Sequence, residues 1–88
     1  MGAILRLSAN LKRLAKGTLG FEVDGDTVGE CISDLVGMVP TLRDTIFLGS
    51  GLNPNIQVEV NRQSVDGEAR LTKKVNDGDQ IRLAYKGH

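Results

Sequence analysis

The sequence has few of the residues that most active sites and metal sites use. Its 88 residues include one cysteine, one histidine, no tryptophan and only three other aromatic residues. A single cysteine excludes a disulfide framework and a cysteine-based metal site. The one histidine, His88, is the last residue, a position that anchors a catalytic triad or a rigid metal site poorly. We therefore expect a protein that is not an enzyme and that has no metal or cofactor of its own.

The sequence also lacks an excess of one charge and a long apolar run. Eleven Lys and Arg balance eleven Asp and Glu, whereas binding to nucleic acid draws most of its affinity from excess positive charge. Three aromatic residues also provide no platform on which bases could stack. No apolar run approaches the roughly 20 residues of a membrane span, and Arg6 interrupts the N-terminal stretch before a signal peptide could form. We expect a cytoplasmic protein with no nucleic-acid or membrane partner.

What is present suffices for one small core. Hydrophobic residues make up 40% of the chain, and a chain of this size buries roughly 60 to 65% of its unfolded surface. We expect a single domain over residues 1–88.

Alternation of apolar and polar residues, the period of a half-buried strand, predicts four strands. They cover residues 3–9, 18–23, 56–61 and 80–85. Residues 11–16 fit a loop or a single helical turn, and 42–47 a short helical segment. Composition predicts a loop over 49–55 and an irregular stretch over 62–76.

Residues 27–39 carry the best local signal, that of an amphipathic helix. Thr27 and Glu30 have the spacing of a capping box, and Pro40 ends the segment. Gly29 and Gly37 each lower helix propensity by about 1 kcal/mol relative to Ala, so this helix must depend on packing. Six apolar residues fall on one stripe of it: Val28, Cys31, Ile32, Leu35, Val36 and Val39.

This order of elements predicts an α+β fold in which one amphipathic helix packs on a mixed four- to five-stranded sheet. The β-grasp arrangement satisfies it. The first and last strands then lie parallel at the centre, and the helix crosses the sheet between two hairpins.

Three features invite a chemical interpretation, and a structural one is favoured for each. Cys31 lies on the apolar stripe with no histidine to activate it, which favours a buried thiol over a nucleophile. The aspartate pairs of residues 24–26 and 77–79 surround a glycine, which favours turns over a cation site. Residues 49–51 are Gly-Ser-Gly, but no Gly-Lys-Ser/Thr follows, which favours a surface loop over a phosphate loop.

The basic residues and the C-terminal tail are the remaining candidates. A solvated surface is the favoured interpretation for the basic residues: Lys12, Arg13, Lys16, Lys73, Lys74, Arg82 and Lys86. Arg82 and Lys86, however, flank the end of the last strand, where they would steer an acidic partner toward the tail. The tail, Tyr85-Lys86-Gly87-His88, has nothing left to fold against, so its backbone is either an exposed functional segment or a frayed terminus.

In this order and at these spacings, four segments resemble the small sulfur carriers of the MoaD and ThiS group. They are Val28-Gly29-Glu30 after a turn, Pro40-Thr41-Leu42-Arg43, residues 56–61, and Asp77-Gly78-Asp79 before the last strand. The resemblance implies the ubiquitin-like β-grasp fold. It also implies a C-terminus that an activating enzyme adenylates with ATP and that becomes a thiocarboxylate, the sulfur donor in molybdopterin, thiamine, cysteine or thionucleoside synthesis. The implied partners are an adenylating enzyme and a sulfur-accepting synthase.

The chain departs from the pattern of that group in two places. The group ends in Gly-Gly, whereas here Gly87 is followed by His88. The group also has Asn-Gly after the third strand, whereas this chain has Asn61-Arg62. A tight turn with positive φ is less favourable for that pair, so we expect a wider or bulged hairpin.

Two functions stay open from the sequence. The first is a sulfur carrier whose functional tail is Tyr85, Lys86, Gly87 and His88. The second is an interaction subunit that keeps the fold without the conjugation chemistry and binds a larger enzyme. The docking candidates are Gln57, Glu59 and Asn61 on the exposed face of the third strand, with Arg82 near the tail.

Overall fold

A computed structural model of the chain describes residues 2–18, 20–49 and 51–86. Five strands form one sheet in the order β2-β1-β7-β5-β6. They are β1 (Ala3–Leu7), β2 (Gly20–Val23), β5 (Ile56–Val60), β6 (Gln63–Val65) and β7 (Gln80–Tyr85). β1 and β7 are parallel, and the other neighbours are antiparallel. The predicted α+β class, with parallel first and last strands at the centre of a mixed sheet, is confirmed.

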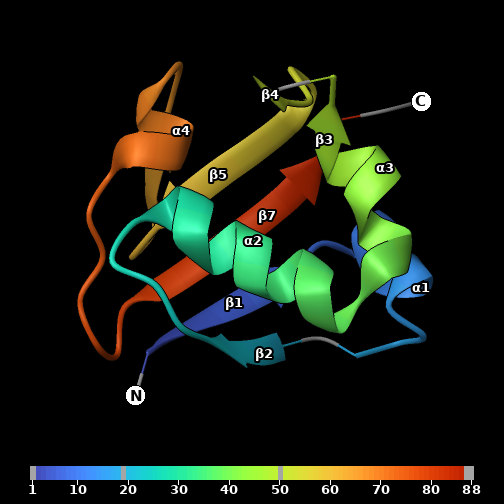
Figure 1. Ribbon diagram of the computed structural model, residues 1–88, viewed down its shortest axis with the longest axis horizontal. Helices are drawn as coiled ribbons and strands as arrows, with labels where there is room; N and C mark the ends of the chain where they lie inside the picture. Colours follow the sequence, from blue (N-terminus) through green and yellow to red (C-terminus); the bar gives the residue numbers. More distant parts are fainter. Residues whose placement is uncertain (1, 19, 50, 87–88) are drawn as a thin grey trace.

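Helix α2 (Val28–Met38) lies across one face of this sheet, as Figure 1 shows. Its predicted stripe is buried from Val28 to Val36, and Val39 follows the helix as its half-buried C-cap. The Thr27 hydroxyl accepts a hydrogen bond from the Glu30 amide at 3.2 Å, and the Glu30 carboxylate accepts one from the Asp26 amide at 2.8 Å. The predicted cap is therefore present, and it fixes where α2 begins.

Short helical elements lie in two of the connections between these strands and α2. β1 stops at Leu7, two residues earlier than predicted, because the Ser8 carbonyl accepts the Lys12 amide at 2.7 Å and opens helix α1 (Ala9–Leu14). After α2, Pro40 opens a single 3-10 turn. That turn is η1 (Pro40–Leu42), and α3 (Arg43–Ile46) follows it.

Three elements lie where the sequence predicts loops or irregular chain: β4 (Gly51–Leu52), β6 and helix α4 (Ala69–Thr72). β3 (Phe47–Leu48) pairs with β4 (Gly51–Leu52) in a two-stranded sheet. β6 and helix α4 (Ala69–Thr72) lie within the stretch predicted to be irregular. Two to four residues are too few to show a period, so the prediction of a loop over 49–55 and an irregular 62–76 is wrong at these elements.

The hairpin between β5 and β6 is tight. Val60 pairs with Gln63, so only Asn61 and Arg62 form the turn, with φ of 51° and 71°. This is a two-residue turn with both central residues left-handed, so the expectation of a wider or bulged hairpin is wrong. The register is set by Val58 and Val60, which are buried on the helix side of the sheet and must stay there.

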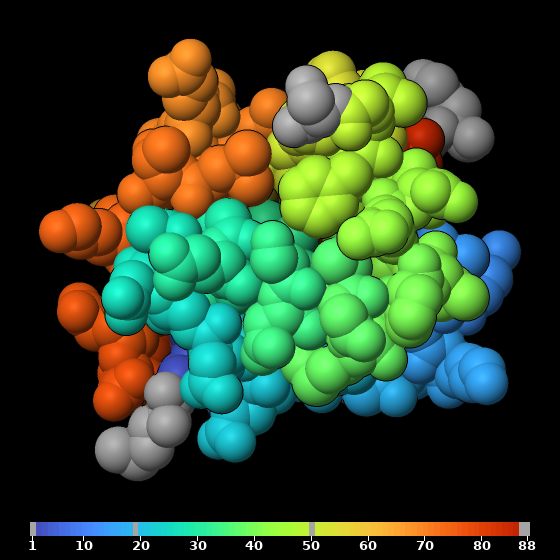
Figure 2. All heavy atoms as spheres, in the orientation of Figure 1, coloured from blue at the N-terminus to red at the C-terminus, as the bar shows by residue number. Residues whose placement is uncertain are grey.

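The core lies between the helix-covered face of the sheet and α2. It takes the inward residues of every strand together with the stripe of α2, and among the described residues no polar or charged side chain is buried. In Figure 2 the side chains of α2 and of the segment after it occupy the centre of this side of the molecule and hide the sheet behind them. The opposite face of the sheet carries the exposed alternate residues of the strands.

Candidate functional site

Two hydrogen bonds hold the backbone at the end of the last strand, at Tyr85 and Lys86. The Tyr85 carbonyl accepts a hydrogen bond from the Asn10 side-chain amide of α1 at 2.8 Å. The Lys86 amide donates to the Asn55 carbonyl, also at 2.8 Å. Tyr85 is half-buried and pairs with Ile56, whereas Lys86 is exposed. Gly87 and His88, the other two predicted tail residues, lie outside the described residues.

The loop that holds Lys86 is itself held by α4. Arg70 donates from Nη1 to the carbonyls of Asn53 and Ile56, at 3.1 and 2.9 Å. Its Nε donates to the Gly67 carbonyl at 3.1 Å. One planar guanidinium thus ties three carbonyls together, which a lysine ammonium could not do in this geometry. Arg70 therefore fixes the loop that holds Lys86.

Asn53 completes this support from within the loop. Its side chain donates to the Thr45 carbonyl at 3.0 Å and accepts the Asn55 amide at 3.0 Å. Because Asn55 also holds Lys86, the position of Lys86 depends on α3, the loop and α4 together.

The open face of the sheet holds the predicted docking residues. Gln57 and Glu59 alternate with the buried residues of β5 and so point to this face, opposite Ala84 and Arg82 of β7. The carboxylate of Glu59 lies 3.8 Å from the Arg82 guanidinium. Asn61 lies at the end of this face, and its side chain is already bonded to Asp79 Oδ1 at 3.1 Å and to the Gln80 amide at 3.0 Å. The structure thus brings Gln57, Glu59 and Arg82 together and gives Asn61 a bracing role beside them.

Two of the three features for which the sequence favours a structural interpretation, Cys31 and the second aspartate turn, make contacts that fit this interpretation. Cys31 is fully buried, and burial, followed by the negative charges of Asp34 and Glu30, raises the pKa of its thiol. A raised pKa disfavours the reactive thiolate, so the buried structural thiol is confirmed. In the second turn, the Asp79 carboxylate accepts the Asn76 amide at 2.8 Å, and this bond, followed by that from Asn61, lowers the pKa of Asp79.

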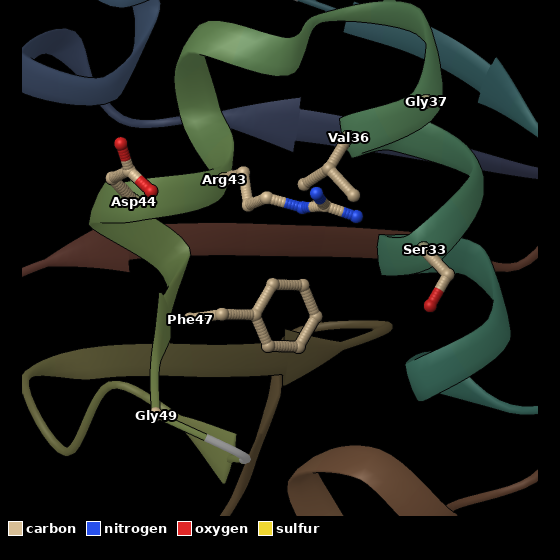
Figure 3. Close-up of a pocket in the computed structure, with 7 residues that line it drawn as sticks. All are labelled: Ser33, Val36, Gly37, Arg43, Asp44, Phe47 and Gly49. Atoms are coloured by element: carbon tan, nitrogen blue, oxygen red, sulfur yellow. The ribbon is translucent and has the colours of Figure 1, made fainter.

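A hollow of about 580 Å³ lies on the helix-covered side, between α2 and the segment from α3 to β3. Figure 3 shows the Arg43 side chain reaching across it toward Val36, with the Phe47 ring facing into it and Asp44 turned away. Ser33 lines it too, but the described residues include no histidine that could activate a hydroxyl.

Within residues 2–18, 20–49 and 51–86, no three His, Cys, Asp or Glu side chains converge as they would to hold a metal. In the same ranges, no helix is long and apolar enough to cross a membrane.

Several residues at the site escape the sequence-based prediction. Asn10, Asn55 and Arg70 act through contacts with residues distant in sequence, 75 positions apart for Asn10 and Tyr85, so no local pattern marks them. Arg6 is different, because its alternation with Leu5 and Leu7 places it on the open face once β1 is known to be a strand.

Comparisons of the sequence with family models and with curated proteins give no match. Solved structures do match along nearly the whole chain. SAMP1 from Haloferax volcanii is 31% identical, with 98% of each chain covered and a TM-score of 0.79. The chain belongs to the ubiquitin-like sulfur carriers of the MoaD and ThiS type.

Two further structures support the fold of this carrier. A chain of the BexX/CysO complex of Amycolatopsis orientalis is 25% identical over 99% of this carrier and 100% of that chain, with a TM-score of 0.84. The small archaeal modifier protein 1 of Methanosarcina acetivorans is 23% identical over 98% of this carrier and 95% of that chain, with a TM-score of 0.87. In the first of these structures CysO is in complex with BexX, and the second is a small modifier protein.

Proposed function

We propose that the C-terminal carboxylate of this carrier is activated by a partner enzyme and converted to a thiocarboxylate. A carboxylate oxygen attacks the α-phosphorus of ATP, which forms an acyl-adenylate and releases pyrophosphate. Hydrosulfide then attacks the acyl carbon, so that a C–S bond forms while the C–O bond to AMP breaks. The thiocarboxylate passes its sulfur to an acceptor bound by a synthase. The carrier itself is not an enzyme in this scheme.

The observation that carries the proposal is the two-sided anchoring of Tyr85 and Lys86. Asn10 and Asn55 hold the backbone of these consecutive residues at the point where the last strand ends. An adenylating site must hold the carboxylate in line with the phosphorus, and an anchored base reduces the freedom that the partner must remove on binding. We infer that Tyr85, Lys86, Gly87 and His88 form the segment that the partner threads.

We also propose that the partner docks on the open face of the sheet. Gln57 and Arg82 supply exposed polar side chains there and Glu59 a half-buried one, and Asn61 braces its edge. Lys86, exposed at the end of β7, extends this surface to the tail. In this scheme residues 1–88 act as one domain. The reaction takes place in the cytoplasm, where ATP and the adenylating enzyme are available.

A second candidate is an interaction subunit that binds the same face without conjugation. The observation that favours it is His88, which stands where the group has its second glycine. A residue with a Cβ and an imidazole takes up more of a narrow channel than glycine does. The two functions differ in whether the tail is consumed as a substrate.

The test is carrier-dependent exchange of pyrophosphate into ATP by the adenylating enzyme encoded in the same genome. We expect exchange with the full chain and at least as much with His88→Gly, which restores the glycine pair. Deletion of residues 86–88 should abolish exchange. An interaction subunit would instead bind the enzyme equally well with and without these residues and support no exchange in any form.

A further inference from the structure

Three arginines gather on the open face, at the end of the sheet away from the tail. Arg6 of β1 and Arg82 of β7 are paired in the register of the two parallel strands. Arg62 reaches the same place from the turn after β5. Together with Glu59, Gln80 and Ile81, the three arginines line a hollow of about 240 Å³.

The charges in this cluster are not balanced within the described part of the chain. Like charges directly opposite each other on neighbouring strands are destabilising, and Arg6 and Arg82 are such a pair. Glu59 lies 3.8 Å from Arg82, with 56% of the arginine side chain and 37% of the glutamate exposed. Among residues 2–18, 20–49 and 51–86, no hydrogen bond or ion pair engages the guanidinium of Arg6 or Arg62. Two guanidinium groups of the described residues, those of Arg6 and Arg62, therefore line the hollow, and the one carboxylate that lines it, Glu59, lies beside Arg82.

We propose that Arg6, Arg62 and Arg82, called here the arginine cluster, dock an acidic segment of the protein partner that acts on the tail. Carboxylates of Asp or Glu match the planar fork of guanidinium, which binds them through two parallel hydrogen bonds. Docking there also relieves the repulsion between Arg6 and Arg82. This inference rests on the proposed function, because it identifies the chemistry by which the partner recognises the carrier.

The arginine cluster and Lys86 are close enough for one partner to contact both. Arg82 and Lys86 are four residues apart on an extended chain, so their Cα atoms are separated by roughly 13 Å at about 3.3 Å per residue. The residues between them on this face are small or uncharged, with Ala84 opposite Gln57. A partner that contacts both the arginine cluster and Lys86 must cover the surface between them. A standard interface, which buries about 800 Å² on each side, is large enough for this.

A protein partner fits the charge pattern better than a nucleic acid does. The chain has no net charge, and Glu59 lines the hollow itself. Glu22 of β2, paired with Ile4, adds another carboxylate nearby. A phosphate backbone, with a charge at every nucleotide, would bring negative charge against both carboxylates, whereas a short acidic segment can place its few carboxylates at the arginines. Electrostatic docking of this kind sets the association rate and the choice of partner.

The experiment measures the steady-state kinetics of pyrophosphate release by the adenylating enzyme of the same genome, with the carrier as the varied substrate. The triple variant Arg6→Gln, Arg62→Gln, Arg82→Gln should raise KM by about tenfold and leave kcat nearly unchanged. The matched control Arg13→Gln, Lys73→Gln, Lys74→Gln removes the same charge elsewhere and should leave KM unchanged. Added salt should raise KM for the wild type more than for the arginine variant. Thermal unfolding confirms that each variant is folded.

Direct binding to the same enzyme separates the possible failures. An unchanged KM in the arginine variant, or a loss confined to kcat, overturns the docking site and leaves the proposed function standing. No turnover, with binding that still depends on the three arginines, overturns the proposed function alone. Absence of both turnover and binding overturns both. Binding of an RNA oligonucleotide at physiological salt that the triple variant loses would also overturn the assignment to a protein partner.

Discussion

Gly29 and Gly37 occupy the same helix, α2, in opposite surroundings. A Cβ on Gly29 would lie 2.8 Å from the Leu71 carbonyl oxygen, whereas a Cβ on Gly37 would meet nothing within 4 Å. Alanine lowers the free energy of a helix by about 1 kcal/mol relative to glycine. We expect Gly37→Ala to raise the free energy of unfolding by about 0.5 to 1 kcal/mol. Gly29→Ala should lower it, because α4 must move away. Denaturant unfolding of both variants checks this, and a gain in both would show that α4 does not press on α2.

At Arg62 the backbone conformation determines how a substitution changes the free energy of unfolding. Its φ of 71° costs a non-glycine residue roughly 1 to 2 kcal/mol, and the greater freedom of unfolded glycine offsets part of the gain. We expect Arg62→Gly to raise the free energy of unfolding by about 0.5 to 1 kcal/mol. Arg62→Ala is the control, since it removes the same side chain without relieving the backbone. Equal effects of the two substitutions would contradict this account of the turn.

Asp79, in the turn before β7, makes the free energy of unfolding depend on pH in the acid range. Its pKa is lowered below the ordinary 3.8, first by the Asn76 amide and then by Asn61. A lowered folded pKa means that the stabilisation is present above 3.8 and is lost as the pH falls through the lower, folded value. We therefore expect the stability difference between wild type and Asp79→Asn to shrink below about pH 4. Unfolding measured at pH 7, 4 and 3 checks this, and a difference independent of pH would contradict it.

At the scale of elements, α4 supports the loop that holds Lys86 through one side chain. Arg70→Lys keeps the charge but loses the fork that joins Asn53, Ile56 and Gly67. We expect a loss of about 1 to 2 kcal/mol in the free energy of unfolding and faster hydrogen exchange at the Lys86 amide, whose acceptor lies in the released loop. Arg13→Lys, at an exposed position of α1, is the control. Unchanged exchange at Lys86 would show that the loop holds the tail without α4.

The elements that can be predicted from the sequence are those long enough to show a regular spacing of apolar residues. The stripe of α2 and its cap span three turns, and β5 alternates over five residues, so both were predicted. β3, β4, β6 and α4 have no period to detect and depend on tertiary contacts, such as that of Asn53 with Thr45. The tail could be predicted because it follows the last strand. Its anchors could not, because Asn10 and Arg70 are brought to it only by the complete fold.

At the scale of the whole molecule, the sheet separates two tasks. One face packs against α2 and holds the core. Among the residues that the structure describes, no polar or charged side chain is buried there. The other face stays open, with the arginine cluster at one end and the anchored base of the tail at the other. In the proposed function the partners supply the catalysis, so the carrier needs little more than these two faces. The balanced net charge thus conceals a local excess of positive charge on the open face.

The most direct measurement is the intact mass of the carrier after incubation with ATP, sulfide and the adenylating enzyme of the same genome. The account predicts a species heavier by the exchange of one oxygen for sulfur, formed only when ATP is present and located at the C-terminal carboxylate by fragmentation. His88→Gly should form this species at least as fast. An unchanged mass in both proteins, with an enzyme that converts a carrier ending in Gly-Gly under the same conditions, would contradict the account.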